Sequence, residues 1–523
     1  MIKKIFNTSL LILLFASSVS FSQESDNIKD VTILHWNDFH ARNLPYRVTK
    51  KNNDTGTDST YYVGGTASML GYLNKYRTAN SLILNGGDDF QGTPISSLTR
   101  GKSQIELLNL YSLDAFVVGN HEFDYGELHL DSVLKEANFD VLSANVFLKT
   151  PNRTIGKPWV TKTINGVKFG IIGLTALDLM TLTVPKNVTD VQMLNTDSLI
   201  NEGIKFCKDE KCNVIVLLTH IGLDNDKKLA DKFYKDVDII VGAHSHTALF
   251  KPTIKNNVFI VQAGSYARYL GKLDLKVDVS KDTVLSGYGK LIETVLDSTS
   301  FDIPAAKKVE NMVASIQGDL LKVIGKLNKD WFSSYKMESN LGQWQADAMR
   351  KRFNTDLAVL NAGGIRKSLP KGEITVNDMW EINPFGNTVV IIKLTGKAVK
   401  QMFKNNLQTY VKEMDELGSS DLSIVSGLKV EYDGKKVLAG DDNFIVSIKT
   451  ADGKDIDDNK IYTISTNNYL GGQFKKYYGD VGEEIILNDT NVIDRDVMID
   501  AVIEQKVIEG TVENRLIDIS KNK

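Results

Sequence analysis

The sequence predicts an α/β protein of two domains, on three observations. The chain has 523 residues, which is more than one hydrophobic core usually organises. Short runs of apolar and β-branched residues alternate with segments of helical periodicity, as in layered sheets and helices. Polar clusters directly follow several of the apolar runs. Because open α/β sheets place their ligands beyond the carboxyl ends of strands, we expect the functional site there.

Residues 1–22 are predicted to be a cleaved signal peptide. Lys3 and Lys4 form a basic start, residues 10–16 an apolar stretch, and small residues precede a cut before Gln23. The apolar stretch is too short to span a bilayer. The sequence therefore predicts a periplasmic or secreted protein with no stable membrane anchor.

Charge and cysteine content argue against two kinds of site. The formal net charge is −3, and no basic stretch is interleaved with aromatics, so we expect no nucleic acid polymer as partner. Cys207 and Cys212 are the only cysteines, which makes a cysteine-based zinc site improbable. They either form a small-loop disulfide in an oxidising compartment or remain free thiols. Oligomeric state is not predicted.

The first domain is expected to span residues 27–300. Polar, turn-rich residues 42–63 are expected to form a loop, and Ser103 with Glu106 a capping box that opens a helix. The β-rich stretch 259–279 should lie near the end of the domain. Helices are predicted at 65–76 and 103–111, and strands at 31–36, 81–85, 115–118, 167–174, 214–218 and 237–241.

A linker helix is predicted at residues 303–323, with Pro304 in its first turn. A smaller α/β domain should follow over residues 324–520. Its distinctive segments are ESNLGQWQADAMR at 338–350, NAGGIR at 361–366 and NPFGN at 383–387.

Five polar motifs stand at the ends of predicted strands. They are NDFH at 37–40, GGDDFQGT at 86–93, GNHEFDYG at 119–126, THIG at 219–222 and GAHSHT at 242–247. Five of the seven histidines lie in these motifs, and we take them together with three other side chains of the motifs as candidate ligands or catalytic groups: His40, His121, His220, His244, His246, Asp38, Asp88 and Asn120. His35 and His129 lie outside them, and we expect structural roles for both.

This concentration of imidazole and carboxylate groups predicts metal binding. Such ligands without thiolate suit Zn, Mn, Fe or Co. The set is too large for one tetrahedral ion. It fits two divalent metal ions that share a bridging carboxylate, an arrangement that clamps phosphoryl groups. Asp124 lies three residues after His121, so it can fix the tautomer of that ring.

The five motifs, in this order, resemble the metallophosphatase motifs of the secreted bacterial 5'-nucleotidase family. NAGGIR and NPFG resemble the C-terminal domain of the same family, and the resemblance covers nearly all of the mature chain. It implies a calcineurin-like metallophosphatase domain, built as a four-layer αββα sandwich. The linker helix and a smaller 5'-nucleotidase C-terminal domain would follow.

The resemblance also implies residue roles. Asp88 would bridge the two ions, and His121, oriented by Asp124, would stabilise the phosphate in the transition state. The remaining ligands would be Asp38, His40 and His246 for one ion, and Asn120, His220 and His244 for the other.

In the second domain, the resemblance implies four substrate-binding residues. Arg366 would bind phosphate and Asn361 the nucleoside, while Phe385 and Tyr469 would sandwich the base. The sequence departs from the family pattern in two places. Tyr335 stands where an arginine is common, and the loop after Tyr469 is shorter and lacks an aspartate, with Gln473 nearby. Both departures concern substrate binding and neither concerns the metals.

The expected function is removal of the 5'-phosphate of nucleotides by attack of a metal-bridging hydroxide, with the small-molecule nucleotide held between two domains. Two alternatives share the chemistry: a 2',3'-cyclic nucleotide phosphodiesterase/3'-nucleotidase, or a nucleotide-sugar hydrolase. A third, from another class, is a nucleotide-binding protein without catalysis. The intact ligand set argues against that third possibility.

Overall fold

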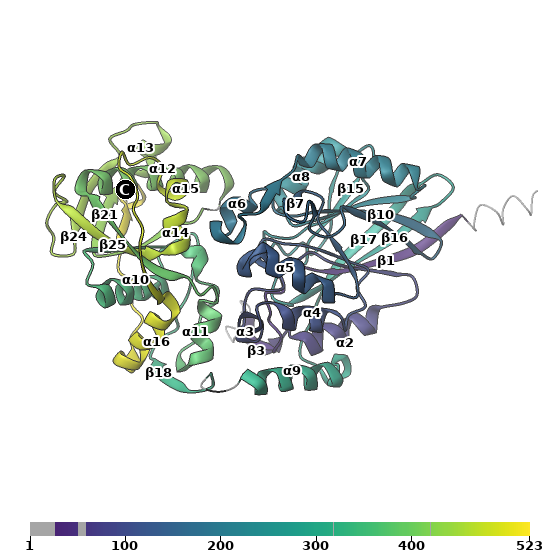
Figure 1. Cartoon of the computed structure of the whole chain (residues 1–523), viewed down its shortest axis with the longest axis horizontal. Helices are drawn as coiled ribbons and strands as arrows, with labels where there is room; N and C mark the ends of the chain where they lie inside the picture. Colours follow the sequence, from purple (N-terminus) through teal and green to yellow (C-terminus); the bar gives the residue numbers. More distant parts are fainter. Residues whose placement is uncertain (1–26, 51–58, 317, 319, 419, 523) are drawn as a thin grey trace, which may run out of the picture. The chain divides into compact units, whose positions relative to one another are not determined.

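The computed structural model describes residues 27–50, 59–316, 318, 320–418 and 420–522, so the predicted signal peptide lies outside it (Figure 1). The chain divides into two compact units, one built mainly from residues up to Val313 and the other mainly from Ala314 onward. Within the described residues, no helix is both long enough and apolar enough to cross a membrane.

The first unit contains two six-stranded sheets. In the first sheet, four parallel strands are extended by two antiparallel ones in the order β17-β16-β1-β4-β5-β6. Their bounds are β1 Ile28–Trp36, β4 Ser81–Asn85, β5 Ala115–Val117, β6 Asp140–Leu142, β16 Tyr269–Asp278 and β17 Thr283–Glu293.

The second sheet has the order β14-β15-β13-β12-β10-β9, and its four central strands are parallel. Its bounds are β9 Trp159–Ile164, β10 Val167–Leu174, β12 Val214–Thr219, β13 Ile239–Val241, β14 Thr253–Lys255 and β15 Val258–Val261. A small sheet of β7 (Val146–Leu148), β8 (Arg153–Thr154) and β11 (Val191–Met193) completes the unit.

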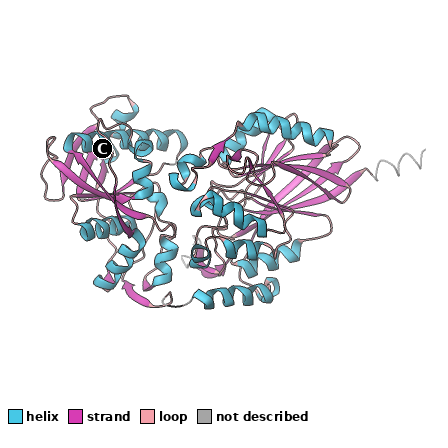
Figure 2. Cartoon of the chain, viewed as in Figure 1, coloured by secondary structure: helices cyan, strands magenta, loops and turns pink. Residues whose placement is uncertain are grey.

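Helices cover the outer face of each sheet (Figure 2). On the first sheet lie α2 (Thr66–Tyr76), α4 (Lys102–Leu108) and α5 (Glu127–Val133), and on the second α7 (Thr196–Asp209) and α8 (Leu223–Phe233). Two short helices are α3 (Pro94–Thr99) and α6 (Leu179–Leu182).

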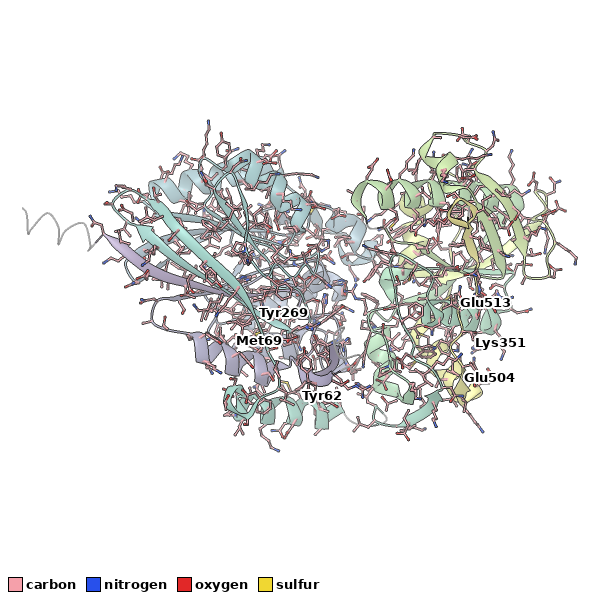
Figure 3. All side chains as sticks on the ribbon, turned by 180° about the vertical axis from the view of Figure 1, so that it is seen from behind. Tyr62, Met69, Tyr269, Lys351, Glu504 and Glu513 are labelled. Atoms are coloured by element: carbon pink, nitrogen blue, oxygen red, sulfur yellow. The ribbon has the colours of Figure 1, made fainter. Side chains whose placement is uncertain are left out.

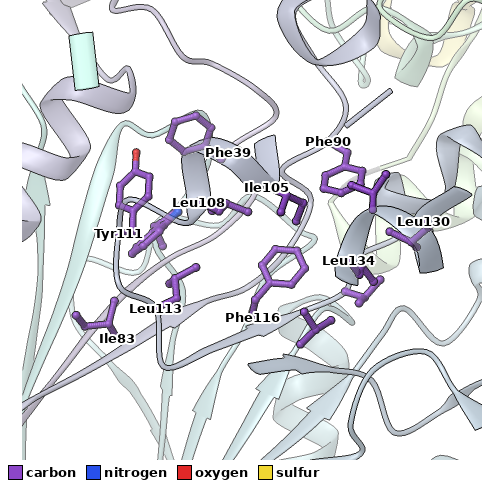
Figure 4. Packing of buried hydrophobic residues seen from close by; sticks show 14 of the residues in the cluster. Phe39, Ile83, Phe90, Ile105, Leu108, Tyr111, Leu113, Phe116, Leu130 and Leu134 are labelled. Atoms are coloured by element: carbon purple, nitrogen blue, oxygen red, sulfur yellow. The ribbon is translucent and has the colours of Figure 1, made fainter. Parts of the chain in front are cut away.

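Side-chain alternation on the strands separates three apolar cores. On β1, Val31 and Ile33 pack between the two sheets, whereas Leu34 and Trp36 pack under the helices. Figure 4 shows the core under the helices of the first sheet, where Phe116 of β5 packs with Ile105 and Leu108 of α4. A third core lies under α7 and α8. Three cores separate four layers, which confirms the predicted αββα sandwich.

Two local predictions for the first unit are wrong. Residues 42–63 contain a hairpin of β2 (Tyr46–Lys50) and β3 (Ser59–Val63), because their β-branched and aromatic residues pair across strands. Ser103 does not cap a helix. It lies inside α4, whose N-cap is Gly101 with a φ of 86°, a conformation that glycine adopts without strain.

The expected linker helix is α9 (Ile303–Ile316), and a strand, β18, already begins at Val323. The helix is therefore shorter than its apolar periodicity suggested.

The second unit is built on a five-stranded sheet in the order β22-β19-β25-β21-β26. Its bounds are β19 Leu357–Asn361, β21 Thr388–Thr395, β22 Ser423–Ser426, β25 Ile461–Asn467 and β26 Asn488–Ile493. Two three-stranded sheets join it, formed by β18 (Val323–Leu327), β20 (Gly372–Thr375) and β27 (Val507–Ile508), and by β23 (Leu428–Tyr432), β24 (Ile445–Thr450) and β28 (Leu516–Asp518).

Helices pack on both faces of the five-stranded sheet, around two apolar cores. On one side α10 packs against α16, and their exposed side chains Lys351 and Glu504 form an ion pair of 2.7 Å (Figure 3). The helices are α10 (Asn340–Phe353), α11 (Val376–Ile382), α12 (Gly396–Leu417), α13 (Gly434–Leu438), α14 (Asn468–Gly472), α15 (Phe474–Tyr478) and α16 (Asp494–Gln505).

Candidate metal centre and substrate residues

Each predicted metal ligand lies just beyond the carboxyl end of a strand. Two follow β1, one follows β4, one follows β5, one follows β12 and two follow β13: Asp38, His40, Asp88, Asn120, His220, His244 and His246. Strands β1, β4 and β5 are parallel neighbours in one sheet, and β12 and β13 are parallel neighbours in the other. Parallel neighbours present their carboxyl ends at one edge, which gathers these side chains.

Five of these residues adopt a backbone conformation that is uncommon outside glycine. The φ angles are 50° for Asp38, 51° for His40, 61° for Asp88, 75° for His244 and 52° for His246. Such strained positions persist only where the surrounding structure imposes them, and they cluster at functional sites.

Asp38, His40 and His246 form the first ligand group. The Nε2 atoms of the two histidines are 3.0 Å apart, and Nε2 of His246 is 3.2 Å from Oδ1 of Asp38. At this distance the lone pairs of two imidazole nitrogens repel each other unless a proton or a cation lies between them. The group is therefore arranged around a positive charge.

Asp88, His220 and His244 form the second group, whose potential ligand atoms all lie within 4.8 Å of one another. Nε2 of His220 is 3.0 Å from Oδ2 of Asp88 and 4.0 Å from Oδ1 of Asp38, so the two groups are adjacent. Asn120 lies at the end of β5, is 3% exposed, and has no hydrogen-bond partner for its Oδ1 among the described residues.

Hydrogen bonds to the other atoms of the candidate ligands leave the ligand atoms available. Nδ1 of His220 donates to the carbonyl of Gly86 at 2.6 Å, which leaves Nε2 free to ligate. Oδ2 of Asp38 accepts the backbone N–H of His244 at 3.0 Å. Oδ1 of Asp38, Oδ1 of Asn120 and Nε2 of His220 are buried without a hydrogen-bond partner among the described residues. Buried polar atoms are rarely left unsatisfied, and metal coordination satisfies all three at once.

The electrostatics also favour cations. Burial raises the pKa of Asp88, but nearby His220 and His121 outweigh it and hold that pKa well below its usual range. Burial lowers the pKa of His220, yet Asp88 and Asp38 raise it to about 10. Burial, followed by neighbouring His220, lowers the pKa of His244 to about 4. Two ionised carboxylates in a buried site require compensating positive charge, and the structure fits two divalent metal ions.

His121 lies beside the metal groups and belongs to neither. Its Nδ1 is 2.9 Å from Oδ2 of Asp124, and its ring centroid is 5.4 Å from that of His40. Its backbone N–H donates to Oδ1 of Asp88 at 2.8 Å. The ring is therefore oriented by Asp124, as predicted from the three-residue spacing.

The structure reveals one functional residue that the sequence prediction missed, Glu122. Its two carboxylate oxygens accept four backbone N–H groups, from Asp88, Asp89, Phe90 and Gly119, at 2.7–3.2 Å. The side chain is 1% exposed. It joins the loop that holds Asp88 to the loop that holds Asn120. The only indication of its importance in the sequence was its position in the GNHEFDYG motif, directly after His121.

The other two histidines lie elsewhere. His35 is buried in β1 against Gly271 of β16, and burial lowers its pKa to about 4. Nε2 of His129 is 2.7 Å from the carbonyl of Arg100. Neither belongs to a metal group among the described residues.

In the second unit, the structure places the predicted substrate residues on adjoining segments. The guanidinium of Arg366 lies 5.8 Å from the ring centroid of Phe385. Asn361 ends β19, and its Oδ1 accepts from Asn467 at the end of β25. Tyr469 follows in α14, with its hydroxyl 3.4 Å from that of Tyr477. Phe385 and Tyr469 are both half-buried, unlike core aromatics.

Tyr335 stands at the position where the resemblance leads us to expect an arginine. It lies against the loop of residues 361–364: a Cβ atom built on Gly363 would be 3.6 Å from the Tyr335 ring. Gln473 is 9% exposed and ends α14, so it is largely withdrawn from solvent. Cys207 and Cys212 are both buried and unbridged.

Two protein families match separate parts of the chain. Residues 31–248 match the calcineurin-like phosphoesterases, and residues 323–478 match the 5'-nucleotidase C-terminal domain. The first match contains all seven candidate ligands, and the second contains all four candidate substrate residues.

Individual relatives agree with both matches. A 5'-nucleotidase from Diplobatis ommata is 28% identical and aligns over 94% of this chain and 90% of its own length. The trifunctional nucleotide phosphoesterase protein YfkN of Bacillus subtilis is 27% identical over 85% of this chain, which spans 32% of that relative's length. The crystal structure of a 5'-nucleotidase precursor from Thermus thermophilus superposes with a TM-score of 0.81 at 28% identity, covering 93% of this chain and 99% of that one. The chain therefore belongs to the 5'-nucleotidase family, with a calcineurin-like phosphoesterase domain followed by a 5'-nucleotidase C-terminal domain.

Proposed function

We propose that this protein removes the 5'-phosphate of nucleotides in the periplasm or outside the cell. The observation that supports the proposal most directly is the pair of adjacent ligand groups around Asp38 and Asp88. When bound, two divalent ions neutralise phosphate charge and make water nucleophilic at neutral pH.

The protein's own side chains have separate tasks in this proposal. Asp38, His40, Asp88 and His246 would hold one ion, and Asp88, Asn120, His220 and His244 would hold the other. His121 donates a hydrogen bond from Nε2 to the phosphate as negative charge develops, because Asp124 holds its Nδ1.

The second unit selects the substrate. Arg366 binds phosphate oxygens through its planar fork, and Asn361 hydrogen-bonds the nucleoside. Phe385 and Tyr469 stack on the base, which tolerates any base identity. The half-exposed rings and the proximity of Arg366 to Phe385 support these roles.

Phosphate release from a substrate panel tests the proposal. The panel contains AMP, 3'-AMP, 2',3'-cyclic AMP, UDP-glucose and p-nitrophenyl phosphate, each measured with and without a chelator. We expect the highest kcat/KM for AMP and loss of all activity after metal removal. Preference for the cyclic nucleotide or for the nucleotide sugar would assign the sister activity, and AMP binding without turnover would identify a binding protein.

A further inference from the structure

A small polar cavity lies inside the second unit, between segments that hold proposed substrate residues. Its volume is about 10 Å³, which is room for one water-sized particle. Asn361 and Gly364 of the NAGGIR segment line one part, and Asn383 and Asn387, which flank Phe385, line another. Gln345 of α10 and Asp494 of α16 complete the polar wall.

Three oxygen atoms of this wall have no hydrogen-bond partner among the described residues: Oε1 of Gln345, Oδ1 of Asn383 and Oδ1 of Asp494. The three residues are only 4%, 2% and 1% exposed, so bulk water does not serve them. Buried acceptors are normally satisfied, and three of them around one cavity indicate a bound particle.

The cavity wall also contains a buried carboxylate. Asp494 is the first residue of α16 and is 1% exposed. The guanidinium of the neighbouring Arg495 lies 3.4 Å from the ring centroid of Trp380, and its Nη1 donates to the carbonyl of Asn383. Burial raises the pKa of Asp494 to about 6, against the lowering effects of the Asn383 side chain and Arg495. The carboxylate is therefore mostly ionised at neutral pH.

We propose that this cavity binds one hard cation, such as Ca²⁺ or K⁺, through the three oxygens of Gln345, Asn383 and Asp494. A water molecule donates only two hydrogen bonds, so it leaves one of the three acceptors unsatisfied. A cation contacts all three oxygens and neutralises the carboxylate. An oxygen-only ligand set favours hard cations over zinc-like ones.

The cation has a structural task that rests on the proposed nucleotide hydrolysis. It joins α10 and α16 to the two loops that present Asn361 and Phe385. Loss of the cation should therefore loosen nucleoside binding and leave the metal centre of the first unit unchanged. Asp494 and its two partner residues are positioning residues in this scheme.

Crystals of the full-length protein grown in CaCl₂ or in RbCl test the site directly, since both ions scatter anomalously. We expect an anomalous peak in the cavity with at least one salt, and for Ca²⁺ oxygen distances of about 2.3–2.6 Å. An ordered water at about 2.7–3.0 Å without anomalous signal in either salt would overturn the proposal.

The variant Asp494→Asn tests the effect of the cation on substrate binding, because it keeps the shape of the side chain and removes its charge. We expect it to abolish the anomalous peak and to raise KM for AMP by about tenfold, with unchanged kcat/KM for p-nitrophenyl phosphate. Asp500→Asn, an exposed change on the same helix, is the matched control. Retention of both the peak and the wild-type KM in Asp494→Asn would contradict the proposal.

A second variant, Gln345→Met, removes one oxygen without touching the carboxylate and replaces Asp494→Asn if that variant misfolds. The diffraction result does not depend on catalysis. A peak in a protein that fails to hydrolyse AMP would therefore support the cation site and reject the proposed function.

Discussion

Asp88 is the residue on which the metal centre depends most. Its backbone has a positive φ, Oδ2 lies 3.0 Å from Nε2 of His220, and Oδ1 accepts the N–H of His121. Oδ1 of the carboxylate is thus held by a hydrogen bond, and Oδ2 faces His220 inside a site where Asp88 is 2% exposed. Its proposed role is to bridge the two ions.

We predict that Asp88→Asn lowers kcat more than about a hundredfold, since loss of an outer-shell partner alone costs 10–100-fold. The amide has the same shape and no charge, so metal content should fall as well. Metal analysis and kinetics check this, with Asp209→Asn, exposed on α7, as control. A variant with two metals and wild-type kcat would disprove the bridging role.

His121→Ala should separate catalysis from metal binding. We expect a loss of about 10²–10³ in kcat, because one donor to developing negative charge disappears. Metal content should stay at the wild-type level, since His121 lies in neither ligand group. If the variant loses metal in elemental analysis, His121 is a ligand and its proposed role is wrong.

Glu122→Gln tests the carboxylate that joins the two ligand loops. A glutamine offers one acceptor oxygen and turns an NH₂ group toward backbone N–H donors, so the free energy of unfolding should fall by about 1–3 kcal/mol. Metal affinity should fall about 10–100-fold, because the Asp88 and Asn120 loops are no longer held together. Denaturant unfolding and metal titration measure both effects, with exposed Glu136→Gln as control. Unchanged metal affinity would limit Glu122 to a stabilising role.

At the scale of elements, close packing of α7 on β10 depends on a residue without a side chain. A Cβ built on Gly170 of β10 would lie 2.2 Å from Sγ of Cys207 on α7. Cys207 is buried in the core between helix and sheet, so its sulfur has little room to move. The close approach of the helix to this sheet therefore depends on the missing side chain at position 170.

We predict that Gly170→Ala lowers the free energy of unfolding by about 1–3 kcal/mol through overpacking. Cys207→Ala removes the obstructing sulfur. The double variant should therefore lose less free energy of unfolding than the sum of the losses in the two single variants. Urea unfolding of the four proteins gives the coupling energy. Additive effects would show that Gly170 and Cys207 do not compete for the same space.

Elements were predicted unevenly, for reasons visible in particular segments. The strand at residues 81–85 and the one at 167–174 have the predicted bounds, because both are mostly apolar and almost entirely buried. The β2–β3 hairpin was missed, since its partly polar strands lack such a run. The start of α4 was also missed. Ser103 has the right spacing from Glu106, but Gly101 ends the preceding turn in a left-handed conformation and becomes the cap.

At the scale of the whole molecule, the two units are proposed to divide hydrolysis and substrate selection. Phe385→Ala tests this division in the full-length protein. We expect KM for AMP to rise about tenfold, because stacking contributes about 1–3 kcal/mol per base. p-Nitrophenyl phosphate lacks a base, so its kcat/KM should not change.

The matched control is Phe250→Ala, which removes a ring that is 60% exposed in the first unit. Equal losses on AMP and on p-nitrophenyl phosphate in Phe385→Ala would show that the second unit supports folding and does not select the substrate.

The sequence by itself determined the α/β class, the positions of most buried strands and the residue types of the metal site, and its resemblance to a known family implied the αββα layers. Alternating and continuous apolar runs specify which strand faces are buried, and polar residues such as Asp38 and Asp88 stand directly after those strands. Tertiary structure alone decided which atoms are left to ligate, because partners such as Gly86 for His220 and the backbone N–H of His244 for Asp38 come from other strands. It also decided the surroundings of Glu122 and Asp494. The contacts of each residue join segments far apart in the chain, and local sequence contains no record of which distant groups a buried carboxylate meets.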